Sequence, residues 1–165
     1  MSFSGAFIIP VAYYKGEKYF YFGVEKNGEV SAFGGKRDKE TIQECAVREF
    51  KEESLGVFAK AKIIEEKLKH QAKHGVKKID KFPSVTYFVP MEKLKYKNPI
   101  KEFATKRANP KLKRSQREMS EVIAVKASEV TRQINLNARV MTFLGHNTRP
   151  LLRSVLQMGK SQGIF

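Results

Sequence analysis

The chain has 165 residues, 41% of them hydrophobic, and this length and composition exclude a disordered segment and predict a single folded domain over residues 1–165. Lysine and arginine number 32 against 17 aspartates and glutamates, and the net charge of +15 predicts a polyanionic partner: RNA, a polyphosphorylated small molecule or an anionic membrane surface. A single cysteine, Cys45, excludes an intramolecular disulfide, and without a signal segment or 18 consecutive apolar residues we expect a soluble, cytoplasmic protein.

The first part of the chain predicts strands that lead to a pair of glycines. Residues 4–14 are apolar and β-rich and predict a buried strand, in which Pro10 indicates an edge position or a bulge. Residues 18–25 alternate aromatic side chains on opposite faces, a pattern typical of a central strand covered on both sides. Residues 26–33 predict a hairpin turn and a further strand.

The rest of the chain mixes helices, strands and one basic segment. Residues 59–74 fit a helix or the end of a strand equally well. Residues 93–117 hold ten basic residues and one acid, Glu102, and this segment predicts a long, mobile basic loop. The other predicted elements are a helix at 40–54, a strand at 83–91, a strand at 119–125, a short helix at 128–133 and a C-terminal helix at 150–158. This order predicts a mixed sheet with helices packed on it.

Three glutamates in the helix at residues 40–54 carry the strongest chemical signal. Glu49, Glu52 and Glu53 lie at helical spacings of three and four, so their carboxylates converge. Like charges on one face repel unless a cation joins them, and clustered carboxylate oxygens suit a hard divalent ion such as Mg²⁺. The alternative is a solvated acidic face balanced by Lys51 and Arg48.

The spacing of the flanking residues strengthens the metal-binding interpretation. It resembles the Nudix hydrolase signature: a glycine, a glutamate six residues later, then Arg-Glu, an apolar residue, any residue and Glu-Glu. The match spans about 24 residues, and its fixed positions are Gly34, Glu40, Arg48, Glu49, Phe50, Glu52 and Glu53. The sequence departs from the signature where the helix ends, since Leu55 is inserted before the closing pair Gly56-Val57.

The resemblance implies a fold, an activity and a set of site residues. The implied fold is an α/β/α sandwich with a mixed central sheet, and the implied activity is Mg²⁺-dependent hydrolysis of a phosphoanhydride in a nucleoside-diphosphate-linked substrate, with Mn²⁺ as a possible substitute. In this family the metal ligands would be Glu49, Glu52, Glu53 and a carbonyl of Gly34 or Gly35, Arg48 and Glu40 would support the site, and Lys36 and Arg37 would contact the substrate.

Two points stay open at this stage, the general base and the substrate. Glu118 and Glu121 are candidates for a general base from a late strand, and Glu121 is assigned that role, with plain surface carboxylates beside Arg117 as the alternative. The excess of positive charge favours a highly phosphorylated substrate: capped RNA tracked by residues 93–117, a diphosphoinositol phosphate or a nucleoside tetraphosphate. The competing hypotheses are a non-catalytic RNA-binding module on a Nudix scaffold and an enzyme that works at a membrane surface.

Overall fold

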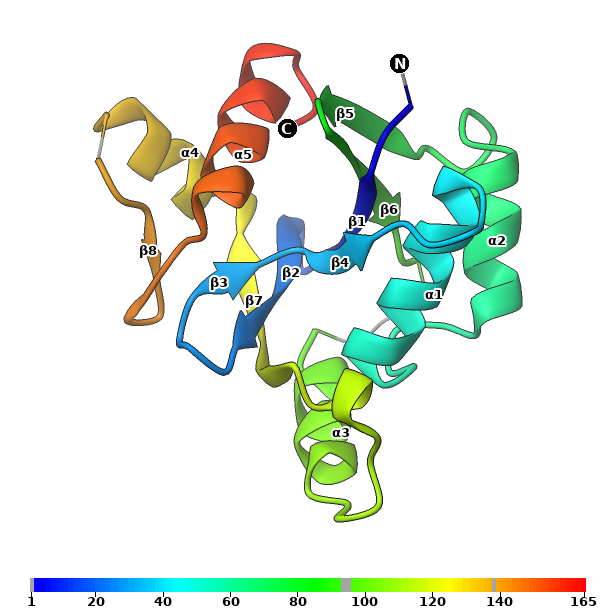
Figure 1. Ribbon diagram of the computed structural model, residues 1–165. Coiled ribbons are helices and arrows are strands. Elements are labelled where there is room, and N and C mark those ends of the chain that lie inside the picture. Colours follow the sequence, from blue (N-terminus) through cyan, green and yellow to red (C-terminus); the bar gives the residue numbers. More distant parts are fainter. Residues whose placement is uncertain (1, 93–95, 138) are drawn as a thin grey trace.

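The computed structural model describes residues 2–92, 96–137 and 139–165, and its centre is a seven-stranded sheet between layers of helices (Figure 1). Helices α1 (Ile42–Ser54) and α2 (Ala61–Lys69) cover one face, and α4 (Ala127–Asn135) and α5 (Pro150–Ser161) cover the other. The strands of the sheet are β1 (Gly5–Tyr14), β2 (Glu17–Glu25), β3 (Val30–Ser31), β4 (Phe33–Lys36), β5 (Lys77–Lys81), β6 (Ser84–Pro90) and β7 (Met119–Lys126). The predicted sandwich with a mixed sheet is confirmed.

Strand β1 is the centre of the sheet and gives it its mixed character. It runs parallel to β6, whereas its first half pairs antiparallel with β4 and its second half antiparallel with β2. The edge position indicated by Pro10 is therefore wrong. Pro10 lies in the gap between Ile8, the last residue paired with β4, and Val11, the first paired with β2. A residue without an N–H is tolerated where the ladder is interrupted.

The alternating aromatics of β2 bury side chains on both faces of the sheet, as predicted. Tyr19 and Tyr21 join the core under α1, and Phe20 and Phe22 join the core under α5. Removing a large apolar side chain of this kind from water stabilises a fold by about 1.5–3 kcal/mol. Both helical layers are thus anchored by one strand.

Helix α1 follows from local signals in its sequence. Thr41 caps its N-terminus in a capping box with Glu44, in which each side chain bonds the backbone N–H of the other residue. Its apolar face, which includes Cys45 and Phe50, is buried against the sheet. Burial also raises the pKa of the Cys45 thiol to about 11, which keeps it protonated at neutral pH. This agrees with the packing role expected of a small residue.

The basic segment is more ordered than predicted, and the interpretation of its described part as a mobile loop is wrong. Residues 93–95 lie outside the described part of the chain, while the remainder contains α3 (Asn98–Arg107) and a 3₁₀ turn, η1 (Arg114–Gln116). Phe103 anchors α3 because its side chain is buried in the core under α1.

Two further segments complete the chain. The ambiguous residues 59–74 contain helix α2, whose buried residues include Ile64 and Leu68. A small hairpin, β8 (Thr142–Phe143) with β9 (His146–Asn147), precedes α5 and was not predicted. Among the described residues, the helices lack the combination of length and hydropathy that crossing a bilayer would require.

Candidate active site

Strand β4 brings the two glycines against helix α1. The glycine pair, which the sequence analysis placed after a strand, lies within β4, where Gly34 pairs with Phe7 and Gly35 with Ala6. A Cβ placed on Gly34 would overlap the carbonyl oxygen of Ala6, and one placed on Gly35 would lie 2.7 Å from the carboxyl carbon of Glu49. Gly34 therefore allows β4 to approach β1 closely, and Gly35 allows the Glu49 carboxylate of α1 to approach the sheet.

Alanine substitutions at these two glycines should have different consequences. In Gly34→Ala the new methyl group meets backbone of β1, so we expect a loss of stability of about 3 kcal/mol or more. In Gly35→Ala it meets the end of a flexible side chain, so Glu49 should move aside at little cost in stability while activity falls. Thermal unfolding together with turnover measures both effects, and equal loss of stability in the two variants would contradict this assignment.

Glu53 is the most deeply buried carboxylate of the cluster. Only 4% of its surface is exposed, and its Oε1 accepts a 2.7 Å hydrogen bond from the Gly34 N–H. Its pKa is raised from 4.5 to about 9, mainly by desolvation and in part by the nearby Glu118 and Glu49, against the lowering effect of the Gly34 bond. A carboxylate held here without a compensating cation therefore retains a proton at neutral pH.

Glu49 and Glu52 extend the acidic cluster along α1 towards solvent. Burial raises the pKa of Glu49, against the opposing effect of Arg48, and the charges of Glu52 and Glu118 raise it as well. The side chain of Glu52 is 32% exposed, against 16% for Glu49. Solvent exposure therefore increases within the cluster, from the buried Glu53 through Glu49 to Glu52.

Arg48 connects this cluster to Glu40 at the start of the helix. Its guanidinium donates to both oxygens of Glu40, at 2.9 and 2.7 Å, and to Glu49 Oε1 at 2.9 Å, and it lies 3.8 Å from Glu52. The hydrogen bonds from Arg48 lower the pKa of Glu40 to about 2. This geometry is what the predicted supporting roles of Arg48 and Glu40 require, since one planar side chain fixes three carboxylates.

Replacing Arg48 by lysine should disorder the carboxylates while keeping the charge. A lysine cannot form the paired bonds to Glu40, so we expect turnover to fall by about 10–100-fold, as for groups that orient metal ligands. The loss of stability should be about 1 kcal/mol, because Arg48 is partly exposed and its ion pairs are screened by water. Kinetics and thermal unfolding of Arg48→Lys provide the measurement, and unchanged turnover would contradict the supporting role.

Glu118 joins the cluster, whereas Glu121 does not. Glu118 lies close enough to Glu53 and Glu49 to raise the pKa of both. Glu121 instead lies 3.4 Å from His146, on the other side of the sheet. Alternation along β7 explains the position of Glu121, because its neighbour Val122 lies in the core under α1, and Glu121 therefore faces the other way. Ser120 is left without a partner, since Glu25 pairs with Met119 and Val24 with Glu121. The structure thus separates Glu121 from the acidic cluster.

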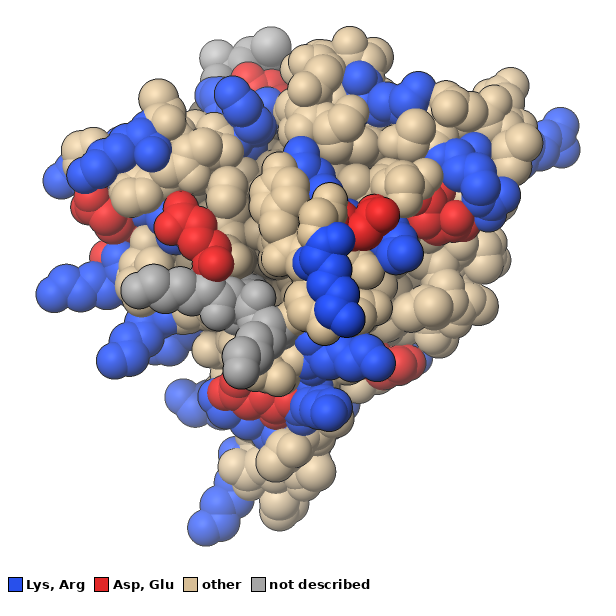
Figure 2. Space-filling view, turned by 180° about the vertical axis from the view of Figure 1, so that it is seen from behind, with Lys and Arg blue, Asp and Glu red and all other residues tan. Residues whose placement is uncertain are grey.

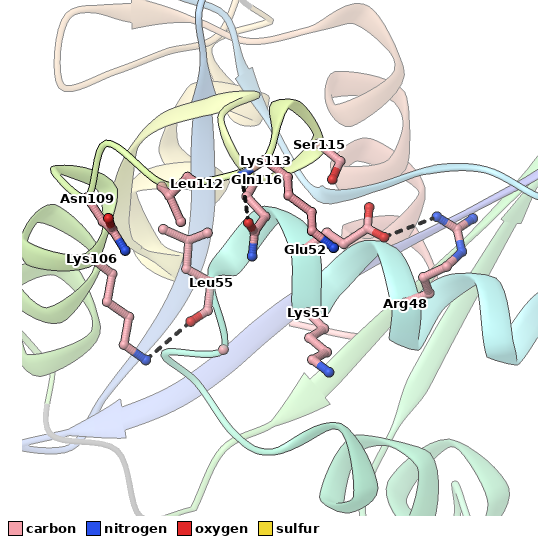
Figure 3. Close-up of a pocket in the computed structure, with 11 residues that line it drawn as sticks. Arg48, Lys51, Glu52, Leu55, Lys106, Asn109, Leu112, Lys113, Ser115 and Gln116 are labelled. Atoms are coloured by element: carbon pink, nitrogen blue, oxygen red, sulfur yellow. Dashed lines mark hydrogen bonds and ion pairs between the residues drawn. The ribbon is translucent and has the colours of Figure 1, made fainter.

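A basic pocket of about 670 Å³ opens beside the acidic cluster (Figure 3). It lies between the end of α1, helix α3 and the segment around η1. Its lining residues, most of which the sequence analysis missed, are Arg48, Lys51, Glu52, Leu55, Gly56, Lys106, Asn109, Leu112, Lys113, Ser115 and Gln116. The only sequence signal for this pocket was the density of positive charge at 93–117.

The two basic residues predicted to contact substrate lie at the end of β4 and do not line this pocket. Lys36 is exposed, and its carbonyl accepts a 3.2 Å bond from Arg48. The backbone N–H of Arg37 donates to the carbonyl of Ser4 at 2.8 Å.

The donor set is chemically suited to a hard divalent cation. Carboxylate and carbonyl oxygens are the ligands of Mg²⁺, and burial, the main cause of the raised pKa values of Glu49 and Glu53, makes a nearby cation favourable for their charged forms. In this structure the oxygens of these two residues are bonded to Arg48 and to the Gly34 N–H. Within the described residues, no three His, Cys, Asp or Glu side chains are arranged to hold a metal ion as they stand.

Comparison with solved structures identifies the fold as that of Nudix proteins. An Ap4A hydrolase from C. elegans, solved as a binary complex, superposes with a TM-score of 0.51 at 12% identity, over 98% of each chain. The Nudix domain of NrtR from Shewanella oneidensis, solved with ADP ribose, superposes with a TM-score of 0.52 at 13% identity, over 98% of this chain and 89% of that one. No family model and no curated protein matches the sequence, so the signature resemblance stays a prediction.

Proposed function

We propose that this protein is a Mg²⁺-dependent pyrophosphohydrolase that cleaves a phosphoanhydride bond in a nucleoside-diphosphate-linked substrate. The observation that carries the proposal is the convergence of the carboxylates of Glu49, Glu53 and Glu118 on a Nudix fold, next to a basic pocket. A buried carboxylate cluster destabilises a fold unless it serves a charged ligand, and the adjacent pocket offers the opposite charge to an anionic substrate.

The residues of the cluster have distinct roles in this proposal. Glu49, Glu52, Glu53 and a carbonyl of Gly34 or Gly35 would hold Mg²⁺, or Mn²⁺ in its place. The cation would neutralise the phosphates and lower the pKa of a bound water.

The remaining side chains would move the proton and hold the ligands in place. Glu118 would accept the proton of the attacking water, the role first assigned to Glu121, because its carboxylate is the one that reaches the cluster. Arg48 and Glu40 would keep the ligands in position. Lys36 and Arg37 would contact the substrate phosphates.

Catalysis is distinguished from simple binding by a substrate panel. The protein would be incubated with Mg²⁺ and with capped RNA, dinucleoside polyphosphates, ADP-ribose, nucleotide sugars or inositol pyrophosphates. We expect product from at least one class, and its loss in Glu52→Gln and Glu53→Gln. RNA binding that weakens steeply with salt, with no cleavage of any compound, would favour the non-catalytic module instead.

A further inference from the structure

The segment between α3 and β7 forms a fixed wall beside the acidic cluster. Arg107 donates to the carbonyls of Met119 and Arg117, at 2.9 and 3.1 Å. Arg117 in turn donates to the carbonyls of Leu112, Asn109 and Pro110, at 3.0, 3.3 and 2.7 Å. The guanidinium groups of Arg107 and Arg117 thus hold the chain around η1 in place by hydrogen bonds to its backbone. Lys106 and Lys113 of the same segment line the pocket.

The wall gives the pocket a marked excess of positive charge. Four basic side chains line it, Arg48, Lys51, Lys106 and Lys113, against one carboxylate, Glu52. Arg48 is also paired with Glu40 and Glu49, and Lys106 lies 3.2 Å from Glu102, outside the pocket. Lys113 is exposed, and no carboxylate is paired with its ammonium group among the described residues. Figure 3 shows the Lys113 side chain running towards Glu52, while Lys51 points away from the other pocket residues. An anionic group is therefore the complementary occupant.

The chemistry of the lining also excludes a stacked base. Among the described residues, the pocket has no phenylalanine, tyrosine or tryptophan in its wall, and its apolar part consists of Leu55, Gly56 and Leu112. Proteins that bind nucleobases without sequence preference stack them on aromatic rings. A pocket of about 670 Å³ lies within the range that holds a whole small ligand. The favoured occupant is a compact, highly charged group without a base.

The distribution of charge elsewhere argues in the same direction. On the face seen in Figure 2, lysine and arginine side chains are spread over several separate places with carboxylates among them. An extended single strand of RNA is bound along a basic groove. The pocket gathers lysine side chains at one concave site, which suits a compact polyanion better than an extended strand.

We propose that Lys106 and Lys113 bind a polyphosphorylated group of the substrate, so that the protein selects compounds with phosphates beyond the cleaved diphosphate. This inference rests on the proposed function for the position of the cleaved bond, while the binding of phosphate to the pocket does not depend on it. The same ammonium groups would accept a linear oligophosphate or a ring that carries several phosphates, since both present clustered phosphate oxygens.

The test is calorimetric binding of inorganic tripolyphosphate and of inositol hexakisphosphate to Lys113→Ala, Lys106→Ala and the double variant, without Mg²⁺. Lys101→Ala is the matched control, because Lys101 is an exposed lysine of α3 that does not line the pocket. We expect the double variant to bind at least one of these probes about tenfold more weakly, equivalent to about 1.4 kcal/mol, and Lys101→Ala to bind like the wild type. The probe that loses more affinity shows whether the pocket prefers a linear oligophosphate or a phosphorylated ring.

Two outcomes would overturn the inference. One is equal affinity in the double variant and in Lys101→Ala. The other is an unphosphorylated RNA oligonucleotide that binds more tightly than both probes and loses affinity in the double variant, which would assign the pocket to RNA. Lys106 also donates to the Leu55 carbonyl at 3.3 Å, so Lys113→Ala, which removes no such bond, guards against an effect on folding.

The kinetic counterpart separates this inference from the proposed function. If the protein hydrolyses the panel, the double variant should raise KM for the substrates with additional phosphates and leave kcat within about twofold. If nothing is hydrolysed but tripolyphosphate binding follows the pattern above, the pocket is supported and the hydrolase proposal fails. Hydrolysis with an unchanged KM in the double variant overturns the pocket alone.

Discussion

Glu53→Gln should abolish hydrolysis and at the same time make the protein more stable at alkaline pH in the absence of divalent cations. A glutamine has nearly the same shape and keeps an oxygen for the Gly34 N–H, but it cannot carry the charge that a cation needs. Lost charge stabilisation of this kind lowers turnover by about 10²–10³-fold. The gain in stability arises because the wild-type carboxylate is buried, with 4% of its surface exposed.

The sign of the pH dependence follows from the raised pKa of Glu53. In the unfolded chain this carboxyl loses its proton near its ordinary value of 4.5, whereas in the folded protein it holds the proton up to a pKa of about 9. The folded state therefore binds more protons between these values, and its stability is fully present below pH 4.5 and is lost as pH rises towards 9. Glu53→Gln removes this contribution.

Thermal unfolding in EDTA from pH 5 to 9 measures this effect. We expect the melting temperature of the wild type to fall with rising pH more steeply than that of Glu53→Gln, so that the variant is a few degrees more stable at pH 8. Added Mg²⁺ should raise the melting temperature of the wild type at pH 8 and leave that of the variant nearly unchanged. A variant that is less stable than the wild type at pH 8 in EDTA would refute this account of the buried carboxylate.

Those parts of the site that depend on neighbours in sequence were predicted well. The helical spacing of the glutamates is local, and α1 has the geometry it indicates, although the helix begins at Ile42 rather than at the predicted residue 40. The supporting roles of Arg48 and Glu40 came from the resemblance to the Nudix signature, and the two side chains do pair, across eight residues of sequence. Both faces of β2 were also predicted correctly, because alternation along one strand is a local pattern.

What could not be predicted depends on contacts between distant segments. Residues 96–117 looked like a loop because charge and proline dominate them, yet the burial of Phe103 and the bonds from Arg107 to the start of β7 fold them into a wall. The place of the glycine pair within a strand was not predicted, because its pairing with β1 is invisible in its own sequence. The pocket exists only where α1, α3 and η1 meet, so the density of positive charge at 93–117 was its only sequence signal.

Glu118→Gln should lower turnover by about 100-fold or more, whereas Glu121→Gln should change it by less than about twofold. The two residues are three positions apart, so alternation places them on opposite faces of a strand, but the sequence alone does not say which face meets α1. Val122 and Ala124 lie in the core under α1, which puts Glu121 on the other face, whereas Glu118, just before β7, lies near Glu53 and Glu49. Glu121 remains beside His146, away from the cluster.

The size of the expected effect reflects the role proposed for Glu118, since proton transfer by a positioned side chain contributes about 10²–10⁴-fold to a rate. Turnover of the best substrate in the panel, measured from pH 6 to 10, should show that Glu118→Gln lowers kcat at every pH while KM changes little. Glu121→Gln is the matched control, because it removes the same charge from the same strand region without touching the cluster. If the two variants lost activity equally, the position of Glu118 beside the cluster would have no catalytic consequence, and the general base would have to be sought elsewhere.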